Sequence, residues 1–440
     1  MDLDEILKDL GEFGNYQLIT YGLLFFPLAF SSMCSLSYVF TTGNLDYRCK
    51  VPECETNITS FDEPWLSDAL PYKNGKLMDS CKRYQPKNNN YHENCTSSLF
   101  SSQIESCHSF IFKNTENSIT KEFDLLCEEN KWKRTLVGTL NNVGMFIGLP
   151  LSGILSDRFG RKKVVVTCVV VSSMFTTLRS FSQNYVQFII LEVLDALVSA
   201  GTYVGIFILG IENMDETNNG QEKQVKIHPM RELFKTRIML LRFLNCSYCW
   251  ITHTFVFYGL SLSSVAIAGN KYFNFILVSF IEIPAYIITW LTIDIFGRKV
   301  SLSMSLVISG ISCTMFHFLD ADMITARLLL FLTGKCAITI SFTVLYVSSS
   351  EMFPTTIRNS LMGFCSTLGR VGSMIAPQMP LLAAYVDPVL IFGAASFVAA
   401  SLALYFPETL NCKMPDTIEE AEMLGRGNIF LHFCLHTRSY

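Results

Sequence analysis

Ten long apolar stretches divide this 440-residue chain, and they constrain its fold more than any other feature. About 20 apolar residues cross a hydrocarbon layer as a helix, in which every backbone group finds its hydrogen bond within the segment. Hydrophobic residues make up 50% of the chain and charged residues only 16%, which is more apolar than a soluble core requires. The sequence therefore predicts an all-α membrane protein. Its spans lie near residues 17–40, 135–155, 164–181, 185–211, 238–262, 272–295, 300–319, 327–348, 361–385 and 389–406.

Charges in the loops predict the orientation of the chain. The segment before the first span is acidic and lacks the basic region of a signal peptide, so this span is expected to be retained. Basic residues gather in alternate loops and aspartates occupy the opposite short loops, and an excess of basic residues marks the cytosolic side. We therefore expect a multi-pass protein of the plasma membrane with both termini in the cytosol. The basic positions are Arg158, Arg161, Lys162, Lys163, Lys223, Lys226, Arg231, Lys235, Arg237, Arg298, Lys299 and Arg358.

A polar segment between the first two spans, residues 41–134, lies outside the cell in this orientation. It holds six cysteines, and an even number in an outer loop indicates three disulfides, although the spacing leaves their pairing open. The sequons NIT and NCT predict N-glycosylation at Asn57 and Asn94. The cysteines are Cys49, Cys54, Cys81, Cys95, Cys107 and Cys127.

A short charged turn occurs twice in the chain. It reads GILSDRFGRKK at residues 153–163 and DIFGRK at residues 294–299, each time between two apolar spans. A turn of this kind, repeated in two halves of a membrane chain, indicates a transporter built from duplicated helix bundles.

Several motifs, taken in order, resemble those of the organic ion transporter family of the major facilitator superfamily. This family includes organic cation, organic anion and carnitine transporters, and the likeness covers nearly the whole chain. Each motif alone is weak, whereas the ordered set is specific and implies the major facilitator fold. The motifs are FGNYQ at 13–17, FTTGNLDYRCKVPECE at 40–55, the GILSDRFGRKK turn, FYGLSL at 257–262, EIPAY at 282–286, GK at 334–335, SSEMFPTTIRN at 349–359 and PETL at 407–410.

The chain departs from the two six-helix bundles of this family after its fourth span. Residues 213–237 resemble the cytosolic loop before the seventh helix of the family, so the fifth and sixth helices are absent and about ten remain. Because two crossings are lost together, every later loop keeps its side of the membrane. The expected organisation is a four-helix bundle over 1–212 with the extracellular loop 41–134, a cytosolic loop over 213–237, a six-helix bundle over 238–408 and a cytosolic tail over 409–440.

The resemblance gives the repeated turn a gating role. Gly153 permits close helix approach, Asp157 faces a helix terminus of the opposite bundle, and Arg158 and Arg161 supply the opposing charge. The alternative is that these are ordinary positive-inside turn residues. By resemblance, Glu351 and Arg358 join the same network in the second half, with a solvated turn as the alternative. The predicted gating residues are Gly153, Asp157, Arg158, Gly160, Arg161, Asp294, Gly297, Arg298, Glu351 and Arg358.

Ionisable residues inside the spans are costly, so each is a candidate for the substrate site. The resemblance implies arginine at the position of Arg370 in the anion and carnitine branches, and an acid at Glu282 in the cation and carnitine branches. An arginine fork can hold a carboxylate, so the two residues together suit a zwitterion such as carnitine. The alternative is that they pair with each other or with other helices. Lys335 is the next candidate, as substrate ligand, counter-ion or gate residue.

Aromatic residues in the spans offer faces for a quaternary ammonium group. The candidates are Trp250, Tyr258, Phe342 and Tyr346, and packing in the core is the alternative for each of them. Glu192 and Asp195 stand where the family more often has arginine and glycine. They either alter the first half of the cavity or face the gap left by the missing helices.

Enzymatic motifs are absent from the sequence. There is no nucleotide-binding GxxxxGK[ST], no HExxH metal motif and no GxSxG turn, so neither catalysis, a metal nor another cofactor is expected. No basic stripe indicates nucleic acid. The predicted function is secondary transport of a small zwitterionic or cationic organic solute by alternating access, with the bilayer as surroundings. A truncated, non-transporting splice form or a regulatory membrane protein is the alternative, and a homo- or hetero-oligomer stays open.

Overall fold

The computed structural model describes residues 15–43, 45–55, 60–73, 77–87, 95–113, 116–215, 236–267, 269–320, 322–355, 357–383, 385–410, 412 and 414–424. Both predicted glycosylation positions, Asn57 and Asn94, lie outside these residues. The chain divides into two compact units. One comprises Ser37–Val137, and the other comprises Met1–Leu36 together with Gly138–Tyr440.

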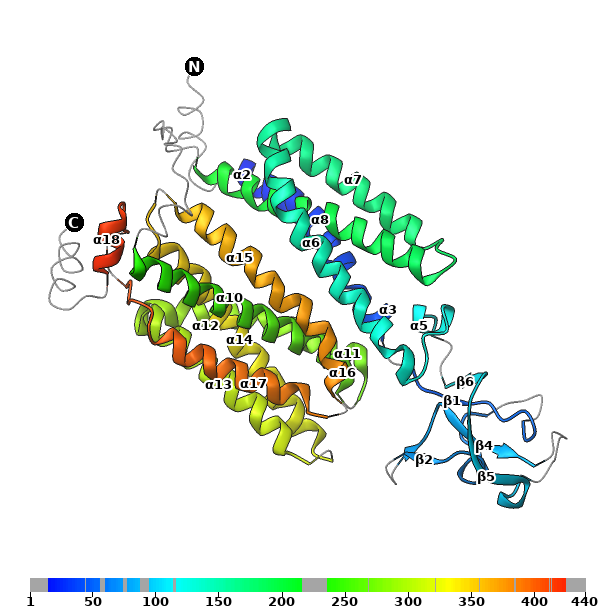
Figure 1. Ribbon diagram of the computed structural model, residues 1–440. Coiled ribbons are helices and arrows are strands. Elements are labelled where there is room, and N and C mark those ends of the chain that lie inside the picture. The colour runs from blue at the N-terminus through cyan, green and yellow to red at the C-terminus, as the bar shows by residue number, and fades with distance from the viewer. Residues whose placement is uncertain are drawn as a thin grey trace. The chain divides into compact units, whose positions relative to one another are not determined.

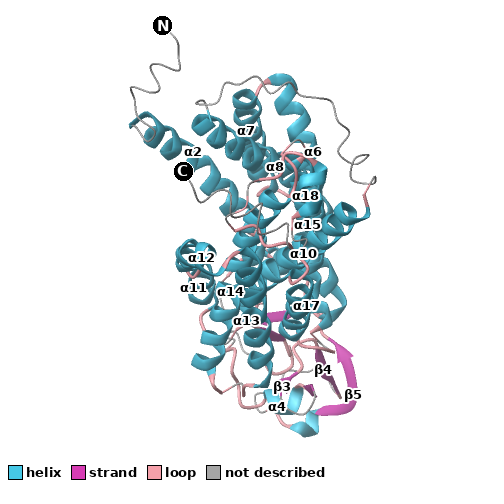
Figure 2. Cartoon of the chain, turned by 90° about the vertical axis from the view of Figure 1, so that its left-hand side faces the viewer, coloured by secondary structure: helices cyan, strands magenta, loops and turns pink. Residues whose placement is uncertain are grey.

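The smaller unit holds three antiparallel pairs of short strands. They are β1 (Tyr47–Cys49) with β6 (Phe110–Phe112), β2 (Tyr72–Lys73) with β3 (Leu77–Met78), and β4 (Lys82–Pro86) with β5 (Phe100–Ser106). Short helices accompany them: α3 (Tyr38–Thr41), α4 (Leu66–Ala69) and α5 (Ile119–Glu122). All strands that the structure describes, magenta in Figure 2, belong to this unit. Its core is small and is formed by residues such as Val51, Leu70 and Phe100.

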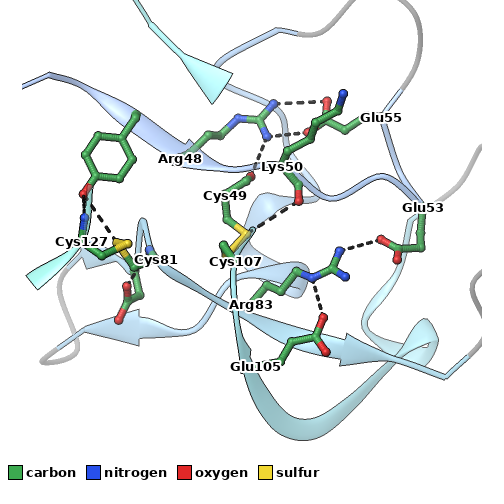
Figure 3. The surroundings of a disulfide bond; sticks show 12 residues. Arg48, Cys49, Lys50, Glu53, Glu55, Cys81, Arg83, Glu105, Cys107 and Cys127 are labelled. Carbon is green, nitrogen blue, oxygen red and sulfur yellow. Dashed lines mark hydrogen bonds and ion pairs between the residues drawn. A yellow bond between two sulfur atoms is a disulfide. The ribbon is translucent and has the colours of Figure 1, made fainter. Parts of the chain in front are cut away.

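Three disulfides connect this small core, as predicted for an outer loop. The structure supplies the pairing that the spacing left open: Cys49–Cys107, Cys54–Cys95 and Cys81–Cys127. Figure 3 shows two arginines that link neighbouring segments. Arg48 is buried and pairs with Glu55 at 2.5 Å, and Arg83 bridges Glu53 and Glu105 at 2.9 and 2.7 Å. Cross-links of this kind stabilise a unit whose apolar core is small.

The larger unit is helical, and each of the ten predicted spans forms helix. The first half contains α2 (Asn15–Leu36), α6 (Lys131–Phe159), α7 (Arg161–Arg179) and α8 (Tyr185–Asp215). The second half contains α10 (Arg237–Ser263), α11 (Lys271–Phe280), α12 (Glu282–Phe296), α13 (Arg298–Phe318), α14 (Ile324–Met352), α15 (Arg358–Ile375), α16 (Met379–Leu382) and α17 (Pro388–Ala403). A short helix, α18 (Ile418–Met423), follows.

Six described helices are long and apolar enough to cross a membrane by themselves, which makes the chain a multi-pass membrane protein. They cover Leu18–Thr41, Glu128–Ser156, Tyr185–Tyr203, Lys271–Phe296, Arg298–Phe318 and Ile324–Met352. The other predicted spans are shorter or more polar. In α10, for example, Ser247, Thr252 and His253 are buried among other helices and are therefore shielded from lipid.

The second half forms the main apolar core. Helix α13 packs against α14 and α17, and α10 packs against α15, as Figure 1 shows. The pair α10 and α15 approaches closely at Gly372, where a Cβ atom would collide with the carbonyl oxygen of Ile251. Small residues at such positions let membrane helices pack backbone against backbone.

The first half is smaller. Helix α7 packs against α8, and α2 packs mainly against α8. Glu192 and Asp195 are buried within this half, at 1% and 5% exposure, so they do not face a gap. Arg179 forms ion pairs with both carboxylates, Asn141 donates to Glu192, and Ser172 and Thr176 donate to Asp195.

The connection between α8 and α10 is too short for two further spans. Helix α8 ends at Asp215 and α10 begins at Arg237. Two crossings need about 20 residues each, which this interval does not contain. The interval therefore has no room for the fifth and sixth helices of the family, whose absence the sequence predicted.

Candidate functional site

Arg370 lies on α15 beside tyrosine side chains from several helices. Its Nη1 donates to the hydroxyl of Tyr258 at 3.4 Å and approaches Sδ of Met145 at 3.9 Å. None of the carboxylates that the structure describes forms an ion pair with it. The guanidinium is therefore a membrane-embedded cation whose charge no described acid neutralises, and such a group is costly unless it serves a ligand.

Three tyrosines lie near this cation, and a fourth, Tyr286, lies near two of the three. We call the four the tyrosine ring: Tyr203, Tyr258, Tyr286 and Tyr346. Tyr203, Tyr258 and Tyr346 lie close enough to Arg370 to interact with it electrostatically. Tyr286 lies near Tyr203, Tyr258 and Glu282. The ring thus joins α8 of the first half to α10, α12 and α14 of the second.

Glu282 and Lys335 form an ion pair between α12 and α14. Their Nζ and Oε1 atoms are 2.9 Å apart, and Lys335 is completely buried. The same Nζ donates to Oγ of Ser261 at 2.8 Å and lies over the ring of Phe257. Of the alternatives open for Glu282, the structure thus shows a pair with another helix, rather than with Arg370.

Glu282 lies where one backbone hydrogen bond is missing from its span. Helix α11 ends at Phe280, α12 begins at Glu282, and Pro284 has no N–H to donate to the carbonyl of Phe280. Ile281, between the two helices, keeps helical dihedral angles, and the N–H groups of Ile281 and Ala285 donate to the carbonyls four residues before them. The span thus continues as one helix past the missing bond, with Glu282 next to it.

The other predicted aromatic residues, Trp250 and Phe342, pack against Tyr346 of the tyrosine ring. Trp250 is buried at 1% exposure, donates to Oγ of Ser349 and packs edge-on against Phe342 and Tyr346, with ring centroids 5.6 and 4.4 Å away. The ring centroid of Phe342 also lies 5.8 Å from that of Phe257. These side chains hold Tyr346 in place, whereas Tyr346 itself is 37% exposed and reaches the site.

Two ring members were not among the predicted residues. Tyr286 follows Glu282 by four positions in EIPAY, so both lie on the same face of a helix, and this spacing is a signal that the sequence offers. Tyr203 and Met145 carry no such signal, because only the packing of the first half against the second brings them to Arg370.

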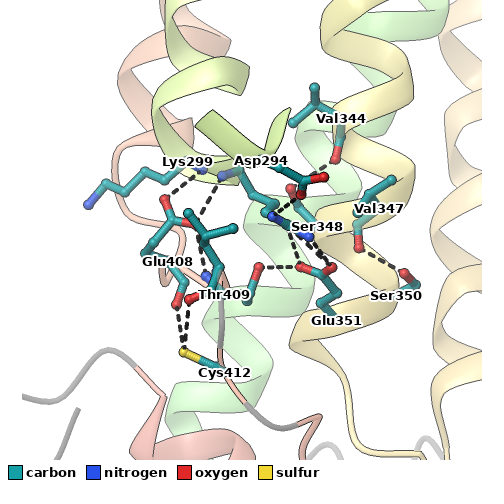
Figure 4. Close-up of polar contacts among 12 residues, drawn as sticks. Asp294, Lys299, Val344, Val347, Ser348, Ser350, Glu351, Glu408, Thr409 and Cys412 are labelled. Atoms are coloured by element: carbon teal, nitrogen blue, oxygen red, sulfur yellow. Dashed lines mark hydrogen bonds and ion pairs between the residues drawn. The ribbon is translucent and has the colours of Figure 1, made fainter. Parts of the chain in front are cut away.

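The second copy of the charged turn carries a network of hydrogen bonds, shown in Figure 4. Arg298 donates to both carboxylate oxygens of Glu351, at 3.0 and 3.1 Å, and to Asp294 at 2.9 Å. Thr409 donates to Glu351 at 2.5 Å. The network ties α12, α13 and α14 to the segment that follows α17.

Glu408, a residue of the PETL motif that was not among the predicted site residues, caps α13. Its two carboxylate oxygens accept from the backbone N–H groups of Arg298 at 2.9 Å and Lys299 at 3.1 Å. The exposed N–H groups and the positive end of a helix both favour this carboxylate. Figure 4 shows Glu408 beside Thr409, on the chain segment that passes the turn.

Both copies of the turn place a glycine in the left-handed region, immediately before a helix. Gly160 has φ +88° and Gly297 has φ +82°. A Cβ atom at Gly160 would meet nothing within 4 Å, whereas one at Gly297 would stand 2.7 Å from Oε2 of Glu408. The two turns thus share a backbone conformation but differ in what lies next to it.

We expect Gly297→Ala to destabilise the protein more than Gly160→Ala. Each alanine is forced into an extended positive-φ conformation that almost only glycine adopts, at a cost of about 1–3 kcal/mol. At Gly297 it also displaces the Glu408 carboxylate, whose bonds are worth about 1.5–3 kcal/mol each. The melting temperatures of the purified variants check this. Equal losses in the two variants would contradict the capping role of Glu408.

The remaining predicted gating residues are placed as follows. Arg358 donates to the carbonyl of Phe353 at 3.4 Å and interacts electrostatically with Glu351. Arg158 lies over the ring of its neighbour Phe159, and Arg161 begins α7. A Cβ atom at Gly153 would meet nothing within 4 Å, and the side chain of Asp157 lies outside the described part of the structure.

Comparison with protein families gives two matches. The Major Facilitator Superfamily model matches residues 131–221, and the Sugar (and other) transporter model matches residues 206–423. Among solved structures, the inward-open xylose transporter XylE from E. coli resembles the chain with a TM-score of 0.51 and 15% identity, over 70% of this chain and 93% of that one. This likeness confirms the predicted fold.

Curated relatives match nearly the whole chain. The rat organic cation/carnitine transporter 2 is 25% identical over 95% of this chain and 94% of its own length. The Drosophila melanogaster organic cation transporter protein is 24% identical over 97% of this chain and 95% of its own length. The rat alignment runs over 534 positions, which exceeds the 440 residues of this chain, so these relatives hold residues that it lacks.

Proposed function

This chain belongs to the organic ion transporter family of the major facilitator superfamily, and from this premise we propose that it transports small zwitterionic solutes that carry a carboxylate. Carnitine and related betaines have this chemistry. The relatives are membrane transporters, and carnitine appears in the name of the rat relative. We place the protein in the plasma membrane with both termini in the cytosol, on the charge asymmetry of its loops.

The observation that carries this proposal is the unneutralised charge of Arg370. The ion pair with Lys335 balances the charge of Glu282, so the site as a whole retains one positive charge. A substrate carboxylate would restore the balance through the guanidinium fork. The tyrosine ring offers aromatic faces to a quaternary ammonium at the other end of the substrate, worth about 0.5–2 kcal/mol. A monocation without a carboxylate would meet net repulsion.

Transport would proceed by rocking of two bundles, residues 1–212 and 238–408, around this site. Residues 213–237 would connect them in the cytosol, and residues 409–440 would form a cytosolic tail. The network of Arg298, Glu351 and Glu408 joins helices of the second bundle to one another and is largely buried. It would keep this end of the bundle together while the bundle moves as a unit between access states.

We expect Arg370→Ala to raise the KM for carnitine about 10- to 100-fold, because a charge-assisted hydrogen bond contributes about 1.5–3 kcal/mol. Uptake of radiolabelled carnitine into cells or proteoliposomes that hold the full chain measures this. Arg370→Lys keeps the charge but lacks the fork, so an intermediate KM is expected.

The control substrate is tetraethylammonium, which has no carboxylate. Its uptake should not fall in Arg370→Ala, since the variant removes a repelling charge. Equal loss of carnitine and tetraethylammonium uptake would contradict the carboxylate role of Arg370. Absence of carnitine binding and uptake by the unaltered chain would contradict the proposed function itself.

A further inference from the structure

Helix α12 is unusually open for a helix that carries part of the site. In the most apolar 18-residue stretch of the span Lys271–Phe296, only 22% of the residues are buried, compared with 50% in those of α13 and α14. One face of α12, with Ala285, Thr289 and Ile293, packs inward and is almost completely covered. The other described faces of the helix are largely exposed.

A stripe of site residues continues onto this exposed surface. Glu282, Tyr286 and Trp290 follow one another at intervals of four, so they lie on one helix face. Glu282 is partly buried, whereas Tyr286 is 51% and Trp290 is 74% exposed. In the part of the chain that the structure describes, this side of the site is therefore left exposed, and its polar end continues into an aromatic and apolar surface.

This arrangement distinguishes two kinds of substrate. A small zwitterion bound at Arg370 would face the open side, where hydrocarbon would meet its polar groups at a cost in desolvation. A zwitterion that carries an alkyl chain would direct this chain outward along Tyr286 and Trp290, where lipid is the natural surroundings. The stripe from Glu282 to Trp290 is about 12 Å long, since a helix rises 1.5 Å per residue.

We propose that the site binds single-chain zwitterionic amphiphiles, which enter it sideways from the bilayer. The proposal rests on the proposed function, because it uses the same head-group site and extends the substrate class. The carboxylate pairs with Arg370, the quaternary ammonium lies against the tyrosine ring, and the alkyl chain lies along the stripe. Complete relatives, which hold more residues than this chain, need not share this opening.

A brominated carboxybetaine tests the proposal in lipid nanodiscs that contain the full chain. The probe is N-alkyl-N,N-dimethylglycine with a twelve-carbon tail that carries bromine, a quencher of tryptophan fluorescence. We expect quenching that saturates with probe concentration, is reversed by excess trimethylglycine, and is lost in Arg370→Ala. Trp290→Phe identifies the quenched tryptophan, because the saturable component should disappear in this variant.

A second measurement tests the contact between Trp290 and the alkyl chain of the probe. Trp290→Ala should weaken binding of the twelve-carbon betaine about 2- to 10-fold, the contribution of an aromatic contact, and should leave trimethylglycine unaffected. Phe318→Ala is the matched control, because Phe318 is also 74% exposed but lies on α13, away from the stripe. It should change neither affinity.

The outcomes separate this inference from the proposed function. Quenching that never saturates and is equal in Arg370→Ala would show partition into lipid only, and would overturn the inference. If carnitine still binds through Arg370 in that case, the proposed function stands. Saturable binding of the tailed betaine without binding of carnitine would support the inference and overturn transport of small zwitterions.

Discussion

Replacement of Arg179 by alanine is expected to destabilise the helical unit by about 3–5 kcal/mol, the cost of breaking a buried ion pair by removing one partner. Glu192 and Asp195 would remain buried in the first half, close to each other and without this cation. The expected result is a large fall in the temperature at which the purified protein stays monodisperse on size-exclusion chromatography. This temperature is the measurement that checks the prediction.

Two further variants serve as a rescue and as a control for Arg179→Ala. Adding Glu192→Gln to Arg179→Ala removes one of the stranded charges and keeps a side chain that Asn141 can bond, so it should recover part of the loss. Lys163→Ala, on the same helix, removes an exposed cation and should change stability by no more than about 0.5 kcal/mol. A loss as small in Arg179→Ala as in Lys163→Ala would contradict the role of the buried cluster.

Replacement of Lys335 by alanine is expected to have an effect of similar size and, in addition, to abolish transport. The ammonium group is completely buried and neutralises Glu282 at 2.9 Å. Its loss leaves the Glu282 carboxylate without a counter-ion beside the tyrosine ring, which lowers the stability by about 3–5 kcal/mol. It also leaves the site without net charge, which removes the attraction for a substrate carboxylate. Thermal stability and carnitine uptake are both measured.

The double variant Lys335→Met with Glu282→Gln separates these two effects. Replacing both members of a buried pair is often nearly neutral for stability, so the thermal loss should be largely recovered. Arg370 then remains as the unneutralised cation, and measurable carnitine binding should return with it. Recovery of stability without any carnitine binding would show that the pair itself contacts the substrate, contrary to its assignment as a balanced structural pair.

The spans, the charged turns and the disulfide-bonded state of the six cysteines between the first two spans were predictable from the sequence because each is a local property. A run of about 20 apolar residues is long enough to cross a membrane whatever its neighbours are. The glycine of each turn precedes a helix and takes a positive φ at Gly160 and Gly297, a conformation that glycine adopts without strain. The short interval between Asp215 and Arg237 likewise excludes two more spans by length alone.

Partner choice was decided only by the tertiary structure, because it depends on contacts between residues far apart in the chain. Glu282 pairs with Lys335 rather than Arg370, and Cys49 pairs with Cys107, although the sequence permits other combinations in both cases. Trp250 and Tyr346 were equal candidates as aromatic residues, yet packing buries the first and exposes the second. Tyr203 reaches Arg370 only because the two halves meet around the site. Spacing along one helix cannot encode such a contact, since it arises from how separate helices pack.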